Sequence, residues 1–86
     1  MRKTRDLLND LDLAISSLHS QGLSRRKIVI LRDISDRLPR DNQNKWGETL
    51  ALIQTELGTL HQYGVDRVAI NRLHSLVYEL GKRSTT

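Results

Sequence analysis

The chain has 86 residues and a formal net charge of +4, and it contains no cysteine and no phenylalanine. This length is typical of one domain, residues 1–86, and the lack of cysteine excludes a disulfide framework and a cysteine-ligated metal site. Acidic and polar residues interrupt the apolar run that would have to follow the basic start. We therefore expect no targeting segment, no membrane-spanning segment and a cytoplasmic protein.

The first predicted helix covers about Arg5 to Gln21. Thr4 is expected to be its N-cap, and Asp6 lies in the first turn, where a negative charge is favourable. Apolar residues recur every three or four positions, which predicts a helix that packs along one side. They are Leu7, Leu8, Leu11, Ala14, Ile15 and Leu18.

A tight turn and a second helix follow. Gly22 is predicted to end the first helix with a positive φ, and the apolar pair Leu18 and Leu23 is typical of a Schellman closure. Ser24 is a good N-cap for the second helix, and Pro39 is expected to end it. The inward-facing residues of this helix are predicted to be Ile28, Leu31, Ile34 and Leu38.

A polar linker, about residues 40–44, precedes the third predicted helix. That helix has an apolar residue at alternating spacings of four and three and is expected to end at Gly64 with a positive φ. Its apolar residues are Trp46, Leu50, Ile53, Leu57 and Leu60.

The fourth predicted helix begins after an Asp66 cap and ends at Gly81, and residues 82–86 are expected to form a frayed tail. Its buried residues are predicted to be Ala69, Ile70, Leu73, Leu76, Val77 and Leu80.

The two halves of the chain share one pattern. The segment 18–31 recurs as the segment 60–73, at an offset of 42 residues, and the flanking apolar residues follow at the same offset. An internal repeat of this kind indicates a duplicated structural unit. We therefore predict an all-α fold of four helices, a small bundle made of two similar αα-hairpins. Repeat one covers about residues 4–39, and repeat two about 45–81.

The segment Gly22 to Leu31 also resembles a helix-turn-helix, with Arg25, Arg26 and Lys27 placed to contact DNA phosphates. Leu18 stands where that motif needs a small residue, and the predicted first helix is longer than the motif requires. The second turn has the same order of residues without the basic triplet, so closure of a hairpin explains the turn by itself. The triplet therefore binds a protein, binds DNA or only faces solvent.

Several apolar residues point away from the predicted stripes. One is Val29 beside the basic triplet, which we group with the triplet as a candidate binding residue. The others are Leu13, Leu52 and Val68. Because a chain of two repeats has a thin core, we expect these three to support a homodimer. Gly47, Ala51 and Gly58 form a ridge of small residues that would allow close approach of another backbone.

The three histidines, His19, His61 and His74, do not have the spacing of a metal motif. No nucleophile stands in a recognisable local signature either. We therefore expect no metal, no cofactor and no enzymatic activity.

One half of the chain has a pattern of apolar residues around the first turn: Leu11, Ile15, Leu18, Gly22, Leu23, Ser24, Arg25, Leu31 and Leu38. This pattern resembles the small helical connector proteins of bacterial biofilm and two-component regulation. The resemblance implies a regulatory interaction protein rather than an enzyme. We accordingly predict a small regulatory or adaptor protein that binds a protein partner through a helical surface, with a DNA-binding transcriptional regulator as the alternative.

Overall fold

The computed structural model describes residues 3–40 and 42–84, and all regular secondary structure in these ranges is helical. The all-α prediction is therefore confirmed. The α-helices are α1 (Thr4–Ser17), α2 (Arg25–Ser35), α3 (Trp46–Leu57) and α4 (Arg67–Ser84). Short 3₁₀ turns connect them: η1 (Leu18–Gln21), η2 (Leu38–Arg40), η3 (Gln43–Lys45) and η4 (Leu60–Tyr63).

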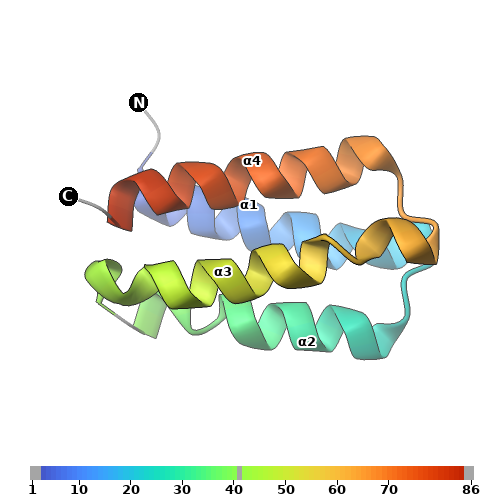
Figure 1. Ribbon diagram of the computed structural model, residues 1–86, viewed down its shortest axis with the longest axis horizontal. Coiled ribbons are helices and arrows are strands. Elements are labelled where there is room, and N and C mark those ends of the chain that lie inside the picture. Colours follow the sequence, from blue (N-terminus) through green and yellow to red (C-terminus); the bar gives the residue numbers. More distant parts are fainter. Residues whose placement is uncertain (1–2, 41, 85–86) are drawn as a thin grey trace.

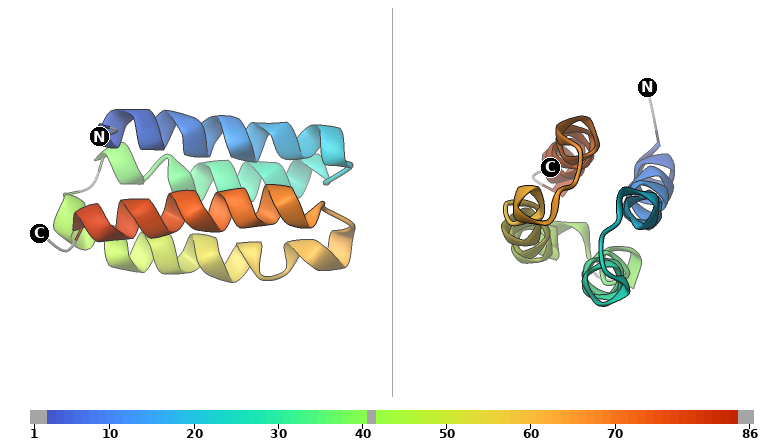
Figure 2. Two further views of the ribbon diagram at one scale, coloured as in Figure 1. Left: turned by 90° about the horizontal axis from the view of Figure 1, so that it is seen from above. Right: turned by 90° about the vertical axis from the view of Figure 1, so that its right-hand side faces the viewer.

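The four α-helices run up and down along one axis and form a single bundle (Figure 1). The turns that contain η1 and η4 lie at one end, whereas the connection between α2 and α3 lies at the other. The end view in Figure 2 shows the four helices around a common centre. Helix α1 packs against α2 and α4, and α3 also packs against α2 and α4, so α1 and α3 are diagonal partners.

The core lies between the four helices and consists almost entirely of aliphatic side chains. Leu11, Ile15, Ile53, Leu73 and Leu80 are fully buried. The predicted stripes are confirmed, with Leu8, Ala14, Ile34, Ala69 and Ile70 only partly buried at their edges. Trp46 is the one buried aromatic residue in the described chain, and its Nε1–H donates a 2.7 Å hydrogen bond to the Leu38 carbonyl. This bond joins the start of α3 to the end of the first hairpin.

The positive φ predicted at both glycine turns is confirmed, but the predicted end of the third helix is wrong: α3 ends at Leu57, and the separate turn η4 reaches Gly64. Gly22 has a φ of 87° and Gly64 a φ of 80°, and within the described residues they alone have a positive φ. In the first turn the Leu23 N–H donates to the Leu18 carbonyl at 3.3 Å, which is the expected Schellman bond. In the second turn the Gly64 N–H donates to the His61 carbonyl, also at 3.3 Å.

The predicted start of the first helix is wrong by one residue. Lys3, not Thr4, is the N-cap, because the N–H groups of Asp6 and Leu7 both donate to the Lys3 carbonyl. Thr4 is already inside α1 and makes no capping hydrogen bond. The α-helical part also ends at Ser17, four residues before Gln21, and continues as the tighter η1.

The predicted end of the fourth helix is also wrong. Gly81 keeps a negative φ and α4 continues to Ser84, whose Oγ–H donates to the Gly81 carbonyl at 2.8 Å. Lys82 and Arg83 occupy the last turn, where positive charges interact favourably with the helix dipole. Residues 82–84 are therefore helical, and the remainder of the predicted tail lies outside the described residues.

The second helix and the linker differ from the prediction in detail. Helix α2 ends at Ser35, and Pro39 lies within η2 rather than directly at the helix end. The Ser35 hydroxyl donates to the Arg32 carbonyl at 3.0 Å, which competes with continued helix hydrogen bonding. The turn η3 overlaps the end of the predicted linker. Part of the connection between α2 and α3 is therefore helical, whereas the sequence predicted a polar loop.

Candidate interaction surface

The start of α2 is fixed by a side-chain cap. Ser24 has extended backbone angles and its Oγ accepts a 3.3 Å hydrogen bond from the Lys27 N–H. The Ile28 N–H donates to the Ser24 carbonyl at 3.2 Å. The predicted N-cap is confirmed, and it sets the direction in which each residue of the basic triplet leaves the helix.

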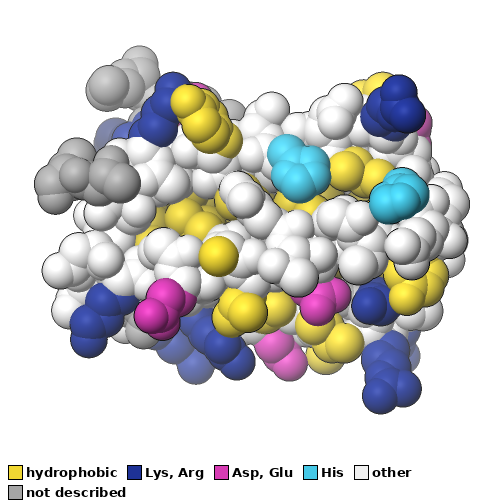
Figure 3. All heavy atoms as spheres, viewed as in Figure 1, with side chains coloured by type: hydrophobic (Ala, Val, Ile, Leu, Met, Phe, Trp, Pro, Cys, Tyr) yellow, Lys and Arg dark blue, Asp and Glu magenta, His cyan; other side chains and the backbone are white. Residues whose placement is uncertain are grey.

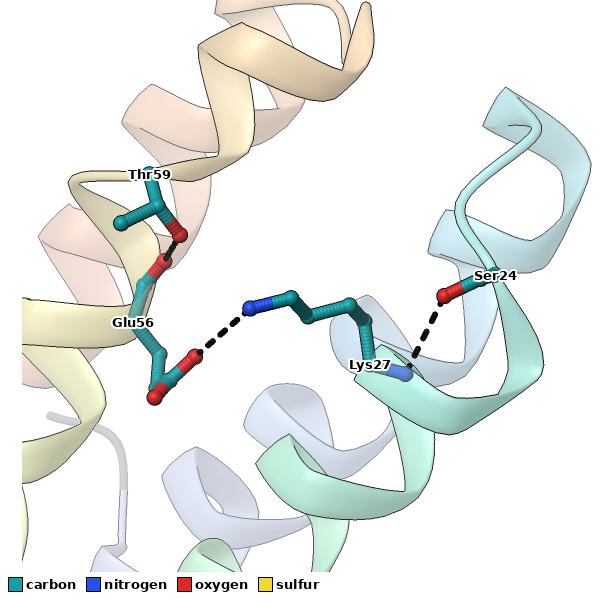
Figure 4. A network of polar contacts seen from close by, with 4 residues as sticks. All are labelled: Ser24, Lys27, Glu56 and Thr59. Atoms are coloured by element: carbon teal, nitrogen blue, oxygen red, sulfur yellow. Dashed lines mark hydrogen bonds and ion pairs between the residues drawn. The ribbon is translucent and has the colours of Figure 1, made fainter.

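Consecutive helical residues point about 100° apart, so the triplet cannot form one patch. Figure 4 shows Lys27 extending from α2 toward α3, where its Nζ lies 3.5 Å from Glu56 Oε2. The same Nζ lies 5.2 Å from the centroid of the Tyr63 ring. Lys27 therefore contributes to the packing of α2 against α3 and η4, a role that the sequence did not reveal.

Arg25 and Arg26 point elsewhere and are exposed. Within the described chain, neither side chain forms a hydrogen bond or an ion pair with its own protein. Arg25 faces α1 and Arg26 projects outward from the bundle, as the helical spacing from the buried Ile28 and Leu31 requires. Two of the three predicted cations thus remain available at the surface.

A shallow groove separates α2 from the end of α1 and η1. The side chains that line it come from both helices: Ser16, His19, Arg25, Ile28, Val29 and Arg32. Val29 is 48% exposed and lies beside Arg25, so the structure brings together two of the predicted binding residues. Arg32 also borders the groove, and its Nε lies 3.6 Å from Oδ1 of Asp12 on α1. Arg32 and His19 were not among the predicted binding residues.

The first hairpin does not have the geometry of a helix-turn-helix. In that motif the two helices cross at about 90–120°. Helices α1 and α2 instead run side by side and antiparallel along the bundle (Figures 1 and 2). Helix α2 is also packed against α3 on its other side. The likeness of Gly22 to Leu31 to that motif is therefore confined to the turn.

The residues predicted to support self-association are exposed but distributed. Leu13 on α1, Leu52 on α3 and Val68 on α4 have exposed fractions of 66%, 47% and 72%. Because α1 and α3 are diagonal in the bundle, no single flat face contains both Leu13 and Leu52. The structure adds three exposed apolar or aromatic residues that the sequence analysis missed: Ile30, Tyr63 and Tyr78.

The described residues contain no cluster of three or more histidine, aspartate or glutamate side chains placed to hold a metal ion. His19 and His61 lie in the two 3₁₀ turns and His74 lies on α4. A separate finding concerns membranes. Across residues 3–40 and 42–84, each helix is too short or too polar to span a bilayer.

Comparison with models of protein families, with curated proteins and with solved structures finds no match to this chain.

Proposed function

We propose that this protein is a small non-enzymatic adaptor or regulator that binds an acidic segment of a protein partner in the groove between α1 and α2. The observation that carries the proposal is the placement of Arg25 and Val29 side by side in this groove, with Arg25 making no ion pair in the described chain. The proposal also keeps the predicted cytoplasmic location.

The helix dipole of α2 makes the basic triplet unfavourable for the fold. The first turn of a helix has a partial positive charge, so each cation there is unfavourable by a few tenths of a kcal/mol. Lys27 is compensated by Glu56 and Tyr63. Arg25 and Arg26 have no such compensation within residues 3–40 and 42–84, which supports a role for these two cations outside the fold.

The groove also contains apolar surface that a partner could cover. Ile28 forms part of its floor and Val29 is exposed beside it, so a bound segment would bury apolar surface between two guanidinium groups. Arginine is enriched at protein interfaces, and its planar guanidinium pairs well with carboxylates. The fitting partner is therefore a segment that carries both carboxylates and at least one apolar side chain.

The proposal also explains a difference between the two repeats. We regard the two hairpins as two copies of one 42-residue unit, of which only the first acquired the basic triplet. The equivalent positions in the second copy are Arg67, Val68 and Ala69. The matching glycine turns at Gly22 and Gly64 support this view, and the copies differ most where the first is proposed to bind its partner.

The experiment is a selection of short peptides from a random display library, followed by NMR mapping on the labelled protein. We expect the selected peptides to combine acidic and apolar residues and to shift the amides of Ser16, His19, Ile28 and Val29. Arg25→Glu/Arg26→Glu should abolish binding. Arg37→Glu/Arg40→Glu makes the same change of charge beyond the far end of α2 and should retain binding.

Two results would contradict the proposal. One is equal binding by both double variants, and the other is a set of shifts centred away from the groove. Duplex DNA serves as the competing ligand in the same assay. Binding to duplex that falls steeply with salt and disappears in Arg25→Glu/Arg26→Glu would favour the DNA-binding alternative.

A further inference from the structure

The groove between α1 and α2 is one part of a longer seam along these two helices. A second shallow pocket lies between the same helices, toward the end of the bundle that contains the α2–α3 connection. Its lining residues are Arg5, Leu8, Asn9, Asp12, Ser35, Asp36 and Pro39. The groove and the second pocket meet where Nε of Arg32 lies 3.6 Å from Oδ1 of Asp12. We call this line of residues the α1/α2 seam.

Charge changes sign along the α2 side of the seam. Arg25 and Arg32 line the groove and lie seven residues apart, so they share one side of the helix and are separated by about 10.5 Å along its axis. Ile28 and Val29 lie between them. Asp36 follows one turn after Arg32, is exposed and lines the second pocket. Helix α2 therefore presents a cation, an apolar step, a second cation and an anion, in that order.

The equivalent part of the second hairpin does not have this charge order. Each of the seven residues that line the second pocket has a counterpart 42 positions later, and all seven counterparts line a groove between α3 and α4. Gln54 replaces Asp12, and Tyr78 replaces Asp36. Figure 3 shows apolar, neutral polar and histidine side chains between α3 and α4, with charged side chains along the margins and ends. Packing of a hairpin therefore does not require the charges of Asp12 and Asp36, which supports a role for them in recognition.

The α1/α2 seam offers little to an extended peptide. A strand-like segment pairs with a free strand edge, but all regular secondary structure in residues 3–40 and 42–84 is helical. A polyproline segment docks in a groove lined by aromatic rings, and the side chains that line the groove and the second pocket include none. A helix satisfies its own backbone hydrogen bonds and docks through its side chains. A helix is therefore the occupant that fits this seam.

We propose that the partner segment is an amphipathic helix that lies along the α1/α2 seam and parallel to α2, an inference that rests on the proposed function. Two carboxylates seven residues apart share one face of a helix at about 10.5 Å and so meet Arg25 and Arg32. Apolar residues three and four positions after the first carboxylate lie over Ile28 and Val29. A basic residue eleven positions after the first carboxylate meets Asp36.

Charge also sets the direction of the bound helix. Acidic residues stabilise the first turn of a helix and basic residues the last turn, so a helix with its carboxylates toward the N-terminus forms most readily. The seam places that end beside Arg25, where α2 itself begins. Asp12 already shares the charge of Arg32, so the carboxylate opposite Arg25 contributes more to binding than the one opposite Arg32.

The first test uses a labelled synthetic peptide with a background of alanine and glutamine. It contains a glutamate, leucines three and four positions later, a second glutamate at seven and a lysine at eleven. We expect it to bind and to gain helix content in circular dichroism. Moving the first glutamate by two positions should weaken binding about tenfold, the loss of one charge-assisted hydrogen bond. A central proline should abolish binding, because it breaks the helix. Equal binding by the proline peptide would overturn the proposal.

The second test exchanges charges across the interface. Arg25→Glu should lose the peptide and regain it when the first glutamate of the peptide is replaced by lysine. Asp36→Lys should regain affinity only when the lysine of the peptide is replaced by glutamate. Arg37→Glu is the control, because this residue follows Asp36 but does not line the seam, and it should bind the unmodified peptide normally. Rescue of Arg25→Glu by a lysine at the second glutamate instead would contradict the parallel direction.

The peptides selected from the display library separate this inference from the proposed function. Selected peptides that shift the groove amides but gain no helix content, or that tolerate a central proline, would overturn the helical partner and leave the proposed function standing. Failure of every acidic and apolar peptide to bind the groove would overturn both. Selected peptides with the spacing of seven between carboxylates would support both.

Discussion

The two hairpin turns of this protein have the same order of a glycine, an apolar residue and a capping residue, yet only the first is followed by a run of cations. Gly22 and Gly64 have φ values of 87° and 80°, and Leu23 and Val65 are both buried. The second turn closes with Arg67, Val68 and Ala69 behind it. Closure of a turn therefore needs the three shared positions, and the first turn does not need Arg25 and Arg26 in order to close.

The largest expected effect tests whether the two turns are equivalent. Gly22→Ala and Gly64→Ala should each destabilise the protein by about 1 kcal/mol, because an L-residue is strained at positive φ. A Cβ at either position meets no atom within 4 Å, so no steric clash adds to this cost. Urea denaturation of both variants measures it.

Gly47→Ala is the matched control in this series, because Gly47 has a negative φ. Equal loss of stability in all three variants would show that positive φ is not the reason for the cost. A loss in only one of the two turn variants would show that the turns are not equivalent.

A smaller effect is expected at the caps. The Ser24 Oγ accepts from the Lys27 N–H at 3.3 Å, and Asp66 Oδ1 accepts from the Val68 N–H at 3.4 Å. Ser24→Ala and Asp66→Ala should each cost about 0.5–1 kcal/mol. Ser75→Ala, inside α4 and exposed, should be neutral or slightly stabilising, because alanine is the better helix former. Urea denaturation measures all three. A Ser24→Ala variant as stable as the parent would show that the Ser24 cap does not contribute to stability.

The smallest effect separates Lys27 from its neighbour Arg25. Lys27→Met removes a partly exposed ion pair and a cation–π contact, and should lower the free energy of unfolding by about 0.5 kcal/mol. Arg25→Met removes an uncompensated cation from the same helical turn and should be neutral or stabilising by a few tenths of a kcal/mol. The two effects should converge at high salt, which screens both. Effects of the same sign and size at low salt would contradict the separate roles of Lys27 in packing and of Arg25 at the surface.

The sequence predicted the features that depend on local chemistry. Gly22, Gly64 and Ser24 act within a few residues of their own positions, and the apolar spacing identified the buried side of each helix. The errors occurred where local rules compete. Gly81 was predicted to end the fourth helix. The Ser84 hydroxyl instead bonds to the Gly81 carbonyl, and the charge of Lys82 interacts favourably with the helix dipole, so α4 continues. At the first helix, the Lys3 carbonyl starts the hydrogen bonding before Thr4 can act as a cap.

The candidate surface was less accessible to prediction, because it depends on the packing of helices. In the sequence the basic triplet looks like a single patch. In the structure, helix periodicity and the position of α3 separate Lys27 from Arg25 and Arg26. No local signal connects Lys27 with Glu56, which lies 29 positions later and meets it only across the bundle. The groove next to Arg25 likewise needs α1 beside α2, and no local pattern indicates that His19 or Arg32 belongs to it.

We propose that Arg25 and Arg26 serve a partner and not the fold. One variant, Arg25→Ser/Arg26→Ser, tests this when both its stability in urea and its affinity for an acidic peptide, selected for binding to the parent, are measured. We expect a midpoint of denaturation that is unchanged or slightly raised, together with loss of peptide binding. A lowered midpoint, or binding as strong as that of the parent, would show that the two arginines do not have this role.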